Sequence, residues 1–221
     1  MERHFHEELR ELKEKLLKMG LMVEAAIEKA VDSLFSRDQA LAKEVIDEEK
    51  FINRLEIEID ERGHSLFALG QPMAIDLRLI TSILKINTDL ERMGDHAVNI
   101  AERALIVLKE PPVKLNLNLP EMAKAAQKML RDVLDAFVNG DVSLARNVLK
   151  SDDEVDAFND NLYRLLEEHM ESHDLNIKVG MSLMMIGHNL ERIADLSNNI
   201  AEDVIYMKQG KDVRHHIDAQ N

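Results

Sequence analysis

The 221-residue sequence contains no cysteine and no tryptophan, only four prolines, and only 4% aromatic residues. Without cysteine the chain has no disulfide, no thiolate metal ligand and no cysteine nucleophile, which suits a reducing compartment. The scarcity of aromatic residues argues against a β-sandwich or barrel. No apolar run approaches the roughly 18 residues of a membrane span, and the charged N-terminus lacks the apolar core of a signal peptide. We therefore expect a cytoplasmic protein with no direct membrane insertion.

Acidic side chains outnumber basic ones by 42 to 28, which gives a formal net charge of −14. Such a surface repels the phosphate backbone of nucleic acids, so a nucleic-acid partner is not expected. Hydrophobic residues at 45% and charged residues at 32% are typical of a folded globular protein that is long enough to bury a core.

Apolar residues recur at spacings of three and four along nearly the whole chain, beginning with Leu9, Leu12 and Leu16. This period predicts amphipathic helices. Asp38 and Asp141 are expected N-caps, and Gly70 and Pro72 are expected to end one helix and start the next. The proline-bracketed stretch 110–120 cannot be helical. The predicted helices are 4–36, 39–69, 72–109, 120–138, 142–172 and 175–208.

The sequence carries an internal repeat with an offset of 100 residues. The string Leu90-Glu91-Arg92-Met93-Gly94-Asp95-His96-Ala97-Val98-Asn99-Ile100-Ala101-Glu102 returns at 190–202, where eight of its thirteen positions are identical. The repeat predicts an all-α fold of two tandem three-helix bundles, residues 1–110 and residues 111–221.

On a helical wheel the repeated carboxylates lie roughly 130–170° from the apolar stripe, so they are expected to point away from each bundle's core. Glu91 and Asp95 are at i and i+4, as are Glu191 and Asp195, and each row continues to Asn99 and Glu102 or to Asn199 and Glu202. Oxygen ligands at this spacing suit a hard or borderline divalent cation. An ordinary solvated acidic face explains the same pattern, and both interpretations stay open at this stage.

Two further i, i+4 pairs lie on the preceding helices: Glu49 with Asn53, and Asp152 with Asp156. They could add ligands to the same clusters. A metal-dependent phosphohydrolase or oxidase that uses these clusters is the alternative function, and a structural scaffold without metal is a third. Elsewhere, Leu84 and Met184 lie off the apolar stripe and hint at an interface, either within the pair of bundles or with a partner. Gly94 is expected where a neighbouring helix approaches closely.

These residues resemble the PhoU family. The string from Leu90 to Glu102 and its copy from Leu190 to Glu202 are similar to the family's repeated signature. Gln71-Pro72-Met73-Ala74-Ile75-Asp76-Leu77-Arg78 is similar to the family's entry into the third helix. The resemblance covers nearly the whole chain.

The resemblance implies a non-catalytic cytoplasmic regulator of phosphate uptake and phosphate-starvation signalling. Its implied partners are the ATPase subunit of a phosphate-specific ABC transporter, a phosphate-sensing histidine kinase and a second copy of the chain. It also implies iron or zinc clusters on the surface, with other divalent cations not excluded. Their ligands would be Glu49, Asn53, Glu91 and Asp95 in one half, and Asp152, Asp156, Glu191 and Asp195 in the other. Asn53 stands where the family has a carboxylate, which predicts weaker binding at the first site, and Leu196 stands where the first half has His96.

Overall fold

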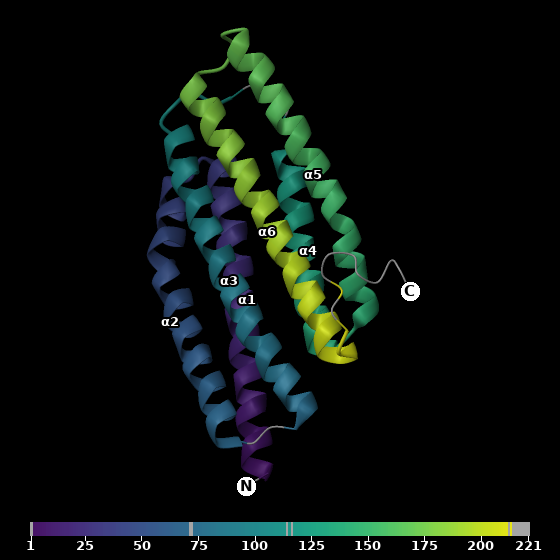
Figure 1. The fold of residues 1–221 in the computed structure, drawn as a ribbon. Helices are drawn as coiled ribbons and strands as arrows, with labels where there is room; N and C mark the ends of the chain where they lie inside the picture. The colour runs from purple at the N-terminus through teal and green to yellow at the C-terminus, as the bar shows by residue number, and fades with distance from the viewer. Residues whose placement is uncertain (1, 71–72, 114, 116, 212, 214–221) are drawn as a thin grey trace.

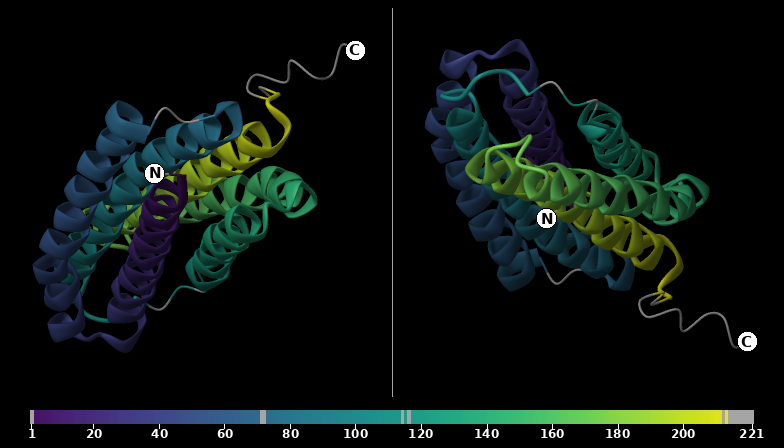
Figure 2. Two further views of the ribbon diagram at one scale, coloured as in Figure 1. Left: turned by 90° about the horizontal axis from the view of Figure 1, so that it is seen from below. Right: turned by 90° about the horizontal axis from the view of Figure 1, so that it is seen from above.

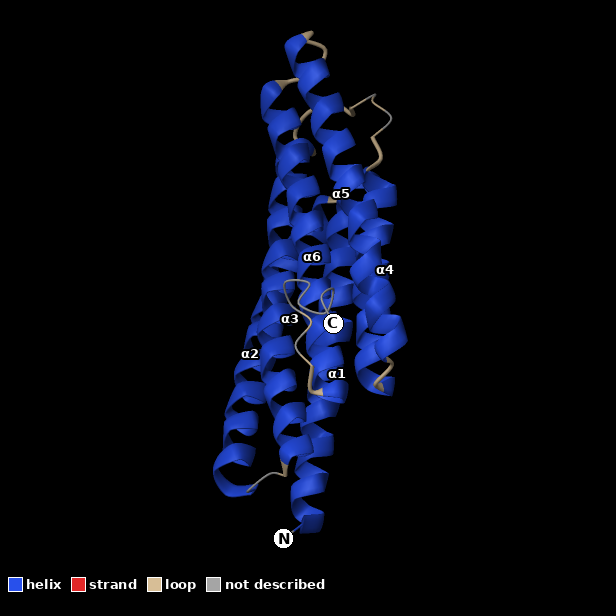
Figure 3. Ribbon diagram, turned by 45° about the vertical axis from the view of Figure 1, so that its right-hand side comes forward, coloured by secondary structure: helices blue, strands red, loops and turns tan. Residues whose placement is uncertain are grey.

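A computed structural model describes residues 2–70, 73–113, 115, 117–211 and 213. Every regular element in this part of the chain is a helix (Figure 3). None of these helices is long and apolar enough to cross a membrane. The six helices are α1 (Glu2–Ser36), α2 (Gln39–Gly70), α3 (Ala74–Val107), α4 (Leu119–Asn139), α5 (Val142–Glu171) and α6 (Ile177–Gln209).

The predicted helix ends agree with the structure to within two residues, and the caps explain where the chain turns. Asp38 Oδ1 accepts hydrogen bonds from the backbone N–H groups of Ala40 and Leu41, and the Asp141 side chain caps α5 in the same way. Gly140, at φ +63°, ends α4 in the left-handed conformation that glycine adopts without strain. Helix α3 begins later than predicted because Met73 is the extended residue before it. The expected helix start at Pro72 lies outside the described residues.

Helices α1–α3 form one three-helix bundle and α4–α6 form the second, and the two bundles join through α3 and α6 (Figure 1). The end-on views show these two helices in the middle of the molecule (Figure 2). They run antiparallel, because Lys85 near the start of α3 pairs with Asp203 near the end of α6, while His96 pairs with Asn189. The fold class is therefore all-α with two tandem bundles, as the repeat predicted.

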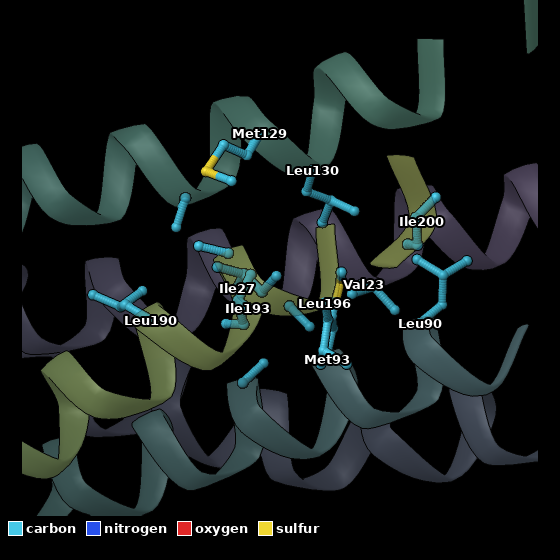
Figure 4. Close-up of a cluster of buried hydrophobic side chains, with 14 of the residues drawn as sticks. Val23, Ile27, Leu90, Met93, Met129, Leu130, Leu190, Ile193, Leu196 and Ile200 are labelled. Carbon is cyan, nitrogen blue, oxygen red and sulfur yellow. The ribbon is translucent and has the colours of Figure 1, made fainter. Parts of the chain in front are cut away.

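One hydrophobic core runs through both bundles. Figure 4 shows side chains from four helices meeting at the centre: Val23 and Ile27 of α1, Leu90 and Met93 of α3, Met129 and Leu130 of α4, and Leu190, Ile193, Leu196 and Ile200 of α6. All of these side chains are buried. Each fully buried aliphatic side chain contributes about 1.5–3 kcal/mol to folding, so this shared core fixes the bundles against each other and sets which faces of α3 and α6 remain exposed.

The described residues between α3 and α4 form no helix, as the prolines predicted, but α4 begins at Leu119 and includes Pro120, so the predicted non-helical stretch 110–120 overlaps its first two residues. The Arg37 guanidinium donates hydrogen bonds to the carbonyl oxygens of Leu108 and Glu110, 2.9 and 2.7 Å away, which ties the α1–α2 turn to the end of α3. The division of the chain between residues 110 and 111 falls in this segment and stays a prediction.

Candidate functional site: two carboxylate clusters

The first cluster, called here the α2–α3 cluster, consists of Glu49, Asn53, Glu56, Glu91 and Asp95. The two helices pack against each other at Gly94, where an added Cβ atom would lie 3.4 Å from the Ile52 side chain, an ordinary van der Waals distance. The neighbouring helix predicted beside Gly94 is present, but its approach does not require glycine. Partial burial, and then the hydrogen bond and charge of the neighbouring Asp95 carboxyl, raise the pKa of Glu49. Burial, followed by the negative charges of Asp95, Glu56 and Glu49, raises the pKa of Glu91.

The second cluster, called the α5–α6 cluster, consists of Asp152, Asp156, Asn159, Glu191 and Asp195. Burial and then the charges of Asp156 and Asp195 raise the pKa of Asp152 to about 6. The pKa of Asp156 is also raised, by burial first and then by Glu191 and Asp195. The fold therefore brings each predicted i, i+4 pair of α2 or α5 beside the matching pair of α3 or α6.

Sequence reasoning missed two members of these clusters, Glu56 and Asn159. Each lies seven residues after the first member of the pair on its helix, Glu49 or Asp152, and so shares the face of that pair. The charge of Glu56 acts on Glu91, and the Asn159 amide donates a hydrogen bond of 2.8 Å to the Glu191 carboxylate. Extending the helical register by two turns would have found both.

The repeated acidic rows do not stay together along α6. Glu191 and Asp195 are half-buried beside α5, whereas Asn199 and Glu202 line a cavity of about 360 Å³ against α3. Lys85, Thr88, Asp89 and Asp203 complete the lining of that cavity. Burial and the charge of Asp203 raise the pKa of Asp89 to about 6. All four side chains lie outside the hydrophobic core, as the helical wheel predicted, but the row is divided between α5 and α3 because α6 lies between these two helices.

Leu84 and Met184 were predicted to mark an interface either within the pair of bundles or with a partner, and the structure shows contacts within the molecule at both. Both side chains are partly buried and pack against the core. Leu84 covers Gly63 of α2, where an added Cβ atom would lie 2.5 Å from its Cδ2 atom. These two residues therefore pack within the molecule. The exposed apolar side chains of α6 are Ile177, Met181 and Met185.

Both clusters offer oxygen donors, the ligand type that hard divalent cations take. Three buried side-chain oxygens accept no hydrogen bond: Asn53 Oδ1, Asp152 Oδ1 and the Oδ1 atom of Asn198, a neighbour of Asp152. Crowded carboxylates repel one another, which raises their pKa values, and a nearby positive charge would relieve that repulsion. In the described part of the chain, however, no group of three or more His, Cys, Asp or Glu side chains is arranged around a single point to hold a metal ion.

The architecture and the duplicated clusters define a class: a helical protein of two tandem bundles that presents polar clusters on its surface. Comparison with known proteins identifies the family. The PhoU domain model matches residues 16–104 and 119–204. A "Phosphate-specific transport system accessory protein PhoU homolog" of Aquifex aeolicus is 42% identical over 208 residues, which is 94% of each chain. A homolog of the same description from Thermotoga maritima is 33% identical over 97% of this chain and 93% of its own.

Solved structures agree with the sequence comparison. The crystal structure of PhoU from Pseudomonas aeruginosa is similar with a TM-score of 0.90 and 36% identity, covering 94% of this chain and all of that one. The phosphate transport system regulatory protein PhoU from Streptococcus pneumoniae is similar with a TM-score of 0.88 and 33% identity, covering 95% and 99% of the two chains. The chain belongs to the PhoU family. This is a family of non-catalytic accessory and regulatory proteins, so membership supports a protein that is not an enzyme and does not favour the phosphohydrolase or oxidase alternative.

Proposed function

We propose that the chain is a regulatory accessory protein of a phosphate-specific transport system. The observation that carries this proposal is the nearly full-length match to proteins with that description, together with a fold that is similar from end to end. The protein acts in the cytoplasm as a helical adaptor. It links the ATPase subunit of the transporter to a phosphate-sensing histidine kinase and damps the starvation response when phosphate is plentiful.

An exposed apolar ridge on α6 supports a protein-binding role. Ile177, Met181 and Met185 follow one another at four-residue spacing and remain 68%, 52% and 37% exposed. Three large apolar side chains on one helix face are the kind of surface that a protein partner covers. Self-association into a homodimer is part of the proposal. Light scattering on the purified protein tests it, and a monomer at micromolar concentration would remove this part.

The adaptor function is tested by deletion and complementation. Deleting the gene should derepress phosphate-starvation genes in high phosphate, and the wild-type gene should restore repression. Met181→Asp places a charge on the ridge and should weaken capture of the ATPase subunit or the kinase, whereas Tyr163→Asp on α5 serves as a matched exposed control. Unchanged expression in the deletion strain would refute the proposed role.

The second part of the proposal is that the two carboxylate clusters bind a divalent cation, iron or zinc in the first instance. The residues that would hold it are Glu49, Asn53, Glu91 and Asp95 in one half, and Asp152, Asp156, Glu191 and Asp195 in the other. A bound cation would supply positive charge between side chains that otherwise repel each other. Elemental analysis of the purified protein tests this directly, and a protein without bound metal after purification in iron- or zinc-supplemented medium would count against it.

A further inference from the structure

A cavity outside both carboxylate clusters lies between the connection that follows α3 and the corner where α5 turns into α6. This corner is at the end of the molecule that also holds the α1–α2 turn (Figure 1). The cavity has a volume of about 480 Å³, which is within the range of about 300–1,000 Å³ typical of small-molecule sites. Its apolar wall is formed by two prolines of the connection and by Val113, Leu115, Leu175 and Val179.

The turn at the end of α5 sets the position of His169 in this wall. The backbone N–H groups of Asp174 and Leu175 both donate hydrogen bonds to the His169 carbonyl oxygen, each over 3.1 Å. His173 adopts the left-handed conformation, with φ at +65°, that commonly reverses the chain at a helix end. The fold therefore holds the His169 ring and the Asp174 carboxylate together at one side of the cavity.

The two nitrogen atoms of the His169 ring have different surroundings. Nδ1 is buried and has no hydrogen-bond partner in the described structure, whereas the side chain as a whole is 30% exposed, so the exposed edge is the one that carries Nε2. Asp174 Oδ2 lies 3.7 Å from Nδ1 and also accepts a hydrogen bond from Ser172 Oγ. Because this negative charge favours a proton on Nδ1, we assign the lone pair to Nε2, which can accept a hydrogen bond from a ligand.

The charges around the cavity disfavour an anion. Glu110 and Asp174 belong to its lining, and among the described lining residues there is no lysine or arginine. The Arg37 guanidinium binds the carbonyl oxygens of Leu108 and Glu110 but is not part of the lining. A carboxylate or phosphate ligand would therefore meet two like charges, and an ammonium group would meet two opposite charges.

We propose that this cavity binds a small organic amine. The apolar body of the ligand lies against the prolines, Val113, Leu175 and Val179, and its ammonium group donates to His169 Nε2 and faces the two carboxylates. The inference is independent of the adaptor function and of the cation binding proposed above. Because the ligand would contact both the connection between the bundles and the α5–α6 corner, its binding should also stabilise the folded protein.

Methyl NMR of the full-length protein tests the site with three probes of the same size. Phenethylamine is the amine, and phenethyl alcohol and phenylacetate are its neutral and anionic analogues. Phenethylamine should shift the methyl signals of Leu115, Leu175 and Val179 in a saturable way, with a Kd of about 0.1–10 mM for a probe of this size. The alcohol should bind about tenfold more weakly, and the carboxylate more weakly still.

Two substitutions with matched controls separate the cavity from the rest of the surface. His169→Phe keeps an aromatic ring but removes the acceptor, and it should weaken phenethylamine binding about tenfold or more. Val113→Trp fills the cavity and should abolish binding. The controls are His64→Phe at an exposed position of α2 and Val138→Trp at an exposed position of α4, and both should bind the amine as the wild type does. Thermal melting confirms that each variant is folded.

Three results would overturn the proposal. The first is the absence of saturable methyl shifts with all three probes at about 50 mM, above the weakest affinity expected. The second is phenylacetate binding as tightly as phenethylamine, which would contradict the charge argument. The third is equal weakening by His64→Phe and His169→Phe, which would show general attraction of amines to a protein of net charge −14. If Val113→Trp does not fold, His169→Phe decides, because it preserves the size of the ring.

Discussion

The substitution Asp95→Asn should have opposite effects on stability with and without metal. In the metal-free protein the Asp95 carboxyl lies beside Glu49 and one helical turn after Glu91, and its charge raises the pKa of both neighbours. Replacing it with the isosteric amide removes that repulsion and leaves the side-chain volume unchanged. The metal-free variant should therefore be more stable than the wild type.

The magnitude follows from two repulsive contacts at a partly exposed site. Like-charge pairs at i, i+4 cost a few tenths of a kcal/mol each, and partly exposed pairs rarely exceed about 1 kcal/mol. We expect a gain of roughly 0.5–1 kcal/mol, which raises Tm by about 1–4 °C in a protein of this size. A cation at one hundred times its Kd would stabilise the wild type by about 2.7 kcal/mol, and the variant should lose most of that gain.

Differential scanning calorimetry after EDTA treatment and dialysis, with and without added Mn²⁺, measures both effects. Asp132→Asn is the control, because it removes a half-buried α4 carboxylate that attracts the exposed Lys128 and lies outside both clusters. This control should lower Tm slightly or leave it unchanged, and it should keep the full response to Mn²⁺. A metal-free Asp95→Asn protein that melts below the wild type would refute the reasoning.

Three further predictions concern the fold that holds the clusters. Asp89 stays protonated to about pH 6 in the folded state, whereas an unfolded aspartate ionises near pH 4; the folded state therefore binds more protons in this window, and stability should fall as pH rises from about 4 to 6. Asp89→Asn should reduce the pH-dependent change in the free energy of unfolding, measured with urea between about pH 4 and 6, by up to about 2–3 kcal/mol. An unchanged pH dependence would show that the raised pKa of Asp89 is not its cause. Asp141→Ala removes the cap that accepts from Ser143 and Leu144 and should cost about 1 kcal/mol by thermal melting, with Asp141→Ser restoring most of it. Met93→Ala, at a fully buried position between the bundles, should cost about 2–5 kcal/mol in urea unfolding, and a loss below 1 kcal/mol would indicate that this core is loosely packed.

Much of the fold could be predicted from the sequence because its signals are local. The apolar period gave six helices, and Asp38 and Asp141 marked two helix starts through side-chain hydrogen bonds to backbone groups a few residues away. The prolines at 111 and 112 predicted the connection between the bundles. The start of α3 was misplaced because a proline that can begin a helix does not determine which residue becomes its N-cap.

The candidate site was predictable in part. The i, i+4 pairs on α3 and α6 follow from helical spacing, and the repeat pointed to their counterparts on α2 and α5. The divergence along α6 was not predictable, since Asn199 and Glu202 meet α3 while Glu191 and Asp195 meet α5. A helical wheel gives the direction of a side chain from its own axis but not the element that occupies that direction.

The sequence by itself determined the all-α class, the duplication and the presence of acidic pairs, because hydrophobic period and residue identity act over a few turns of one helix. Only the tertiary structure decided the electrostatic state of each pair. It showed that Arg192 pairs with Asp195 while Arg92 pairs with Asp89, and that Asn189 is engaged by His96. The physical reason is that the partner of a charged side chain depends on burial and on groups contributed by helices far away in the sequence, and packing alone brings those groups together.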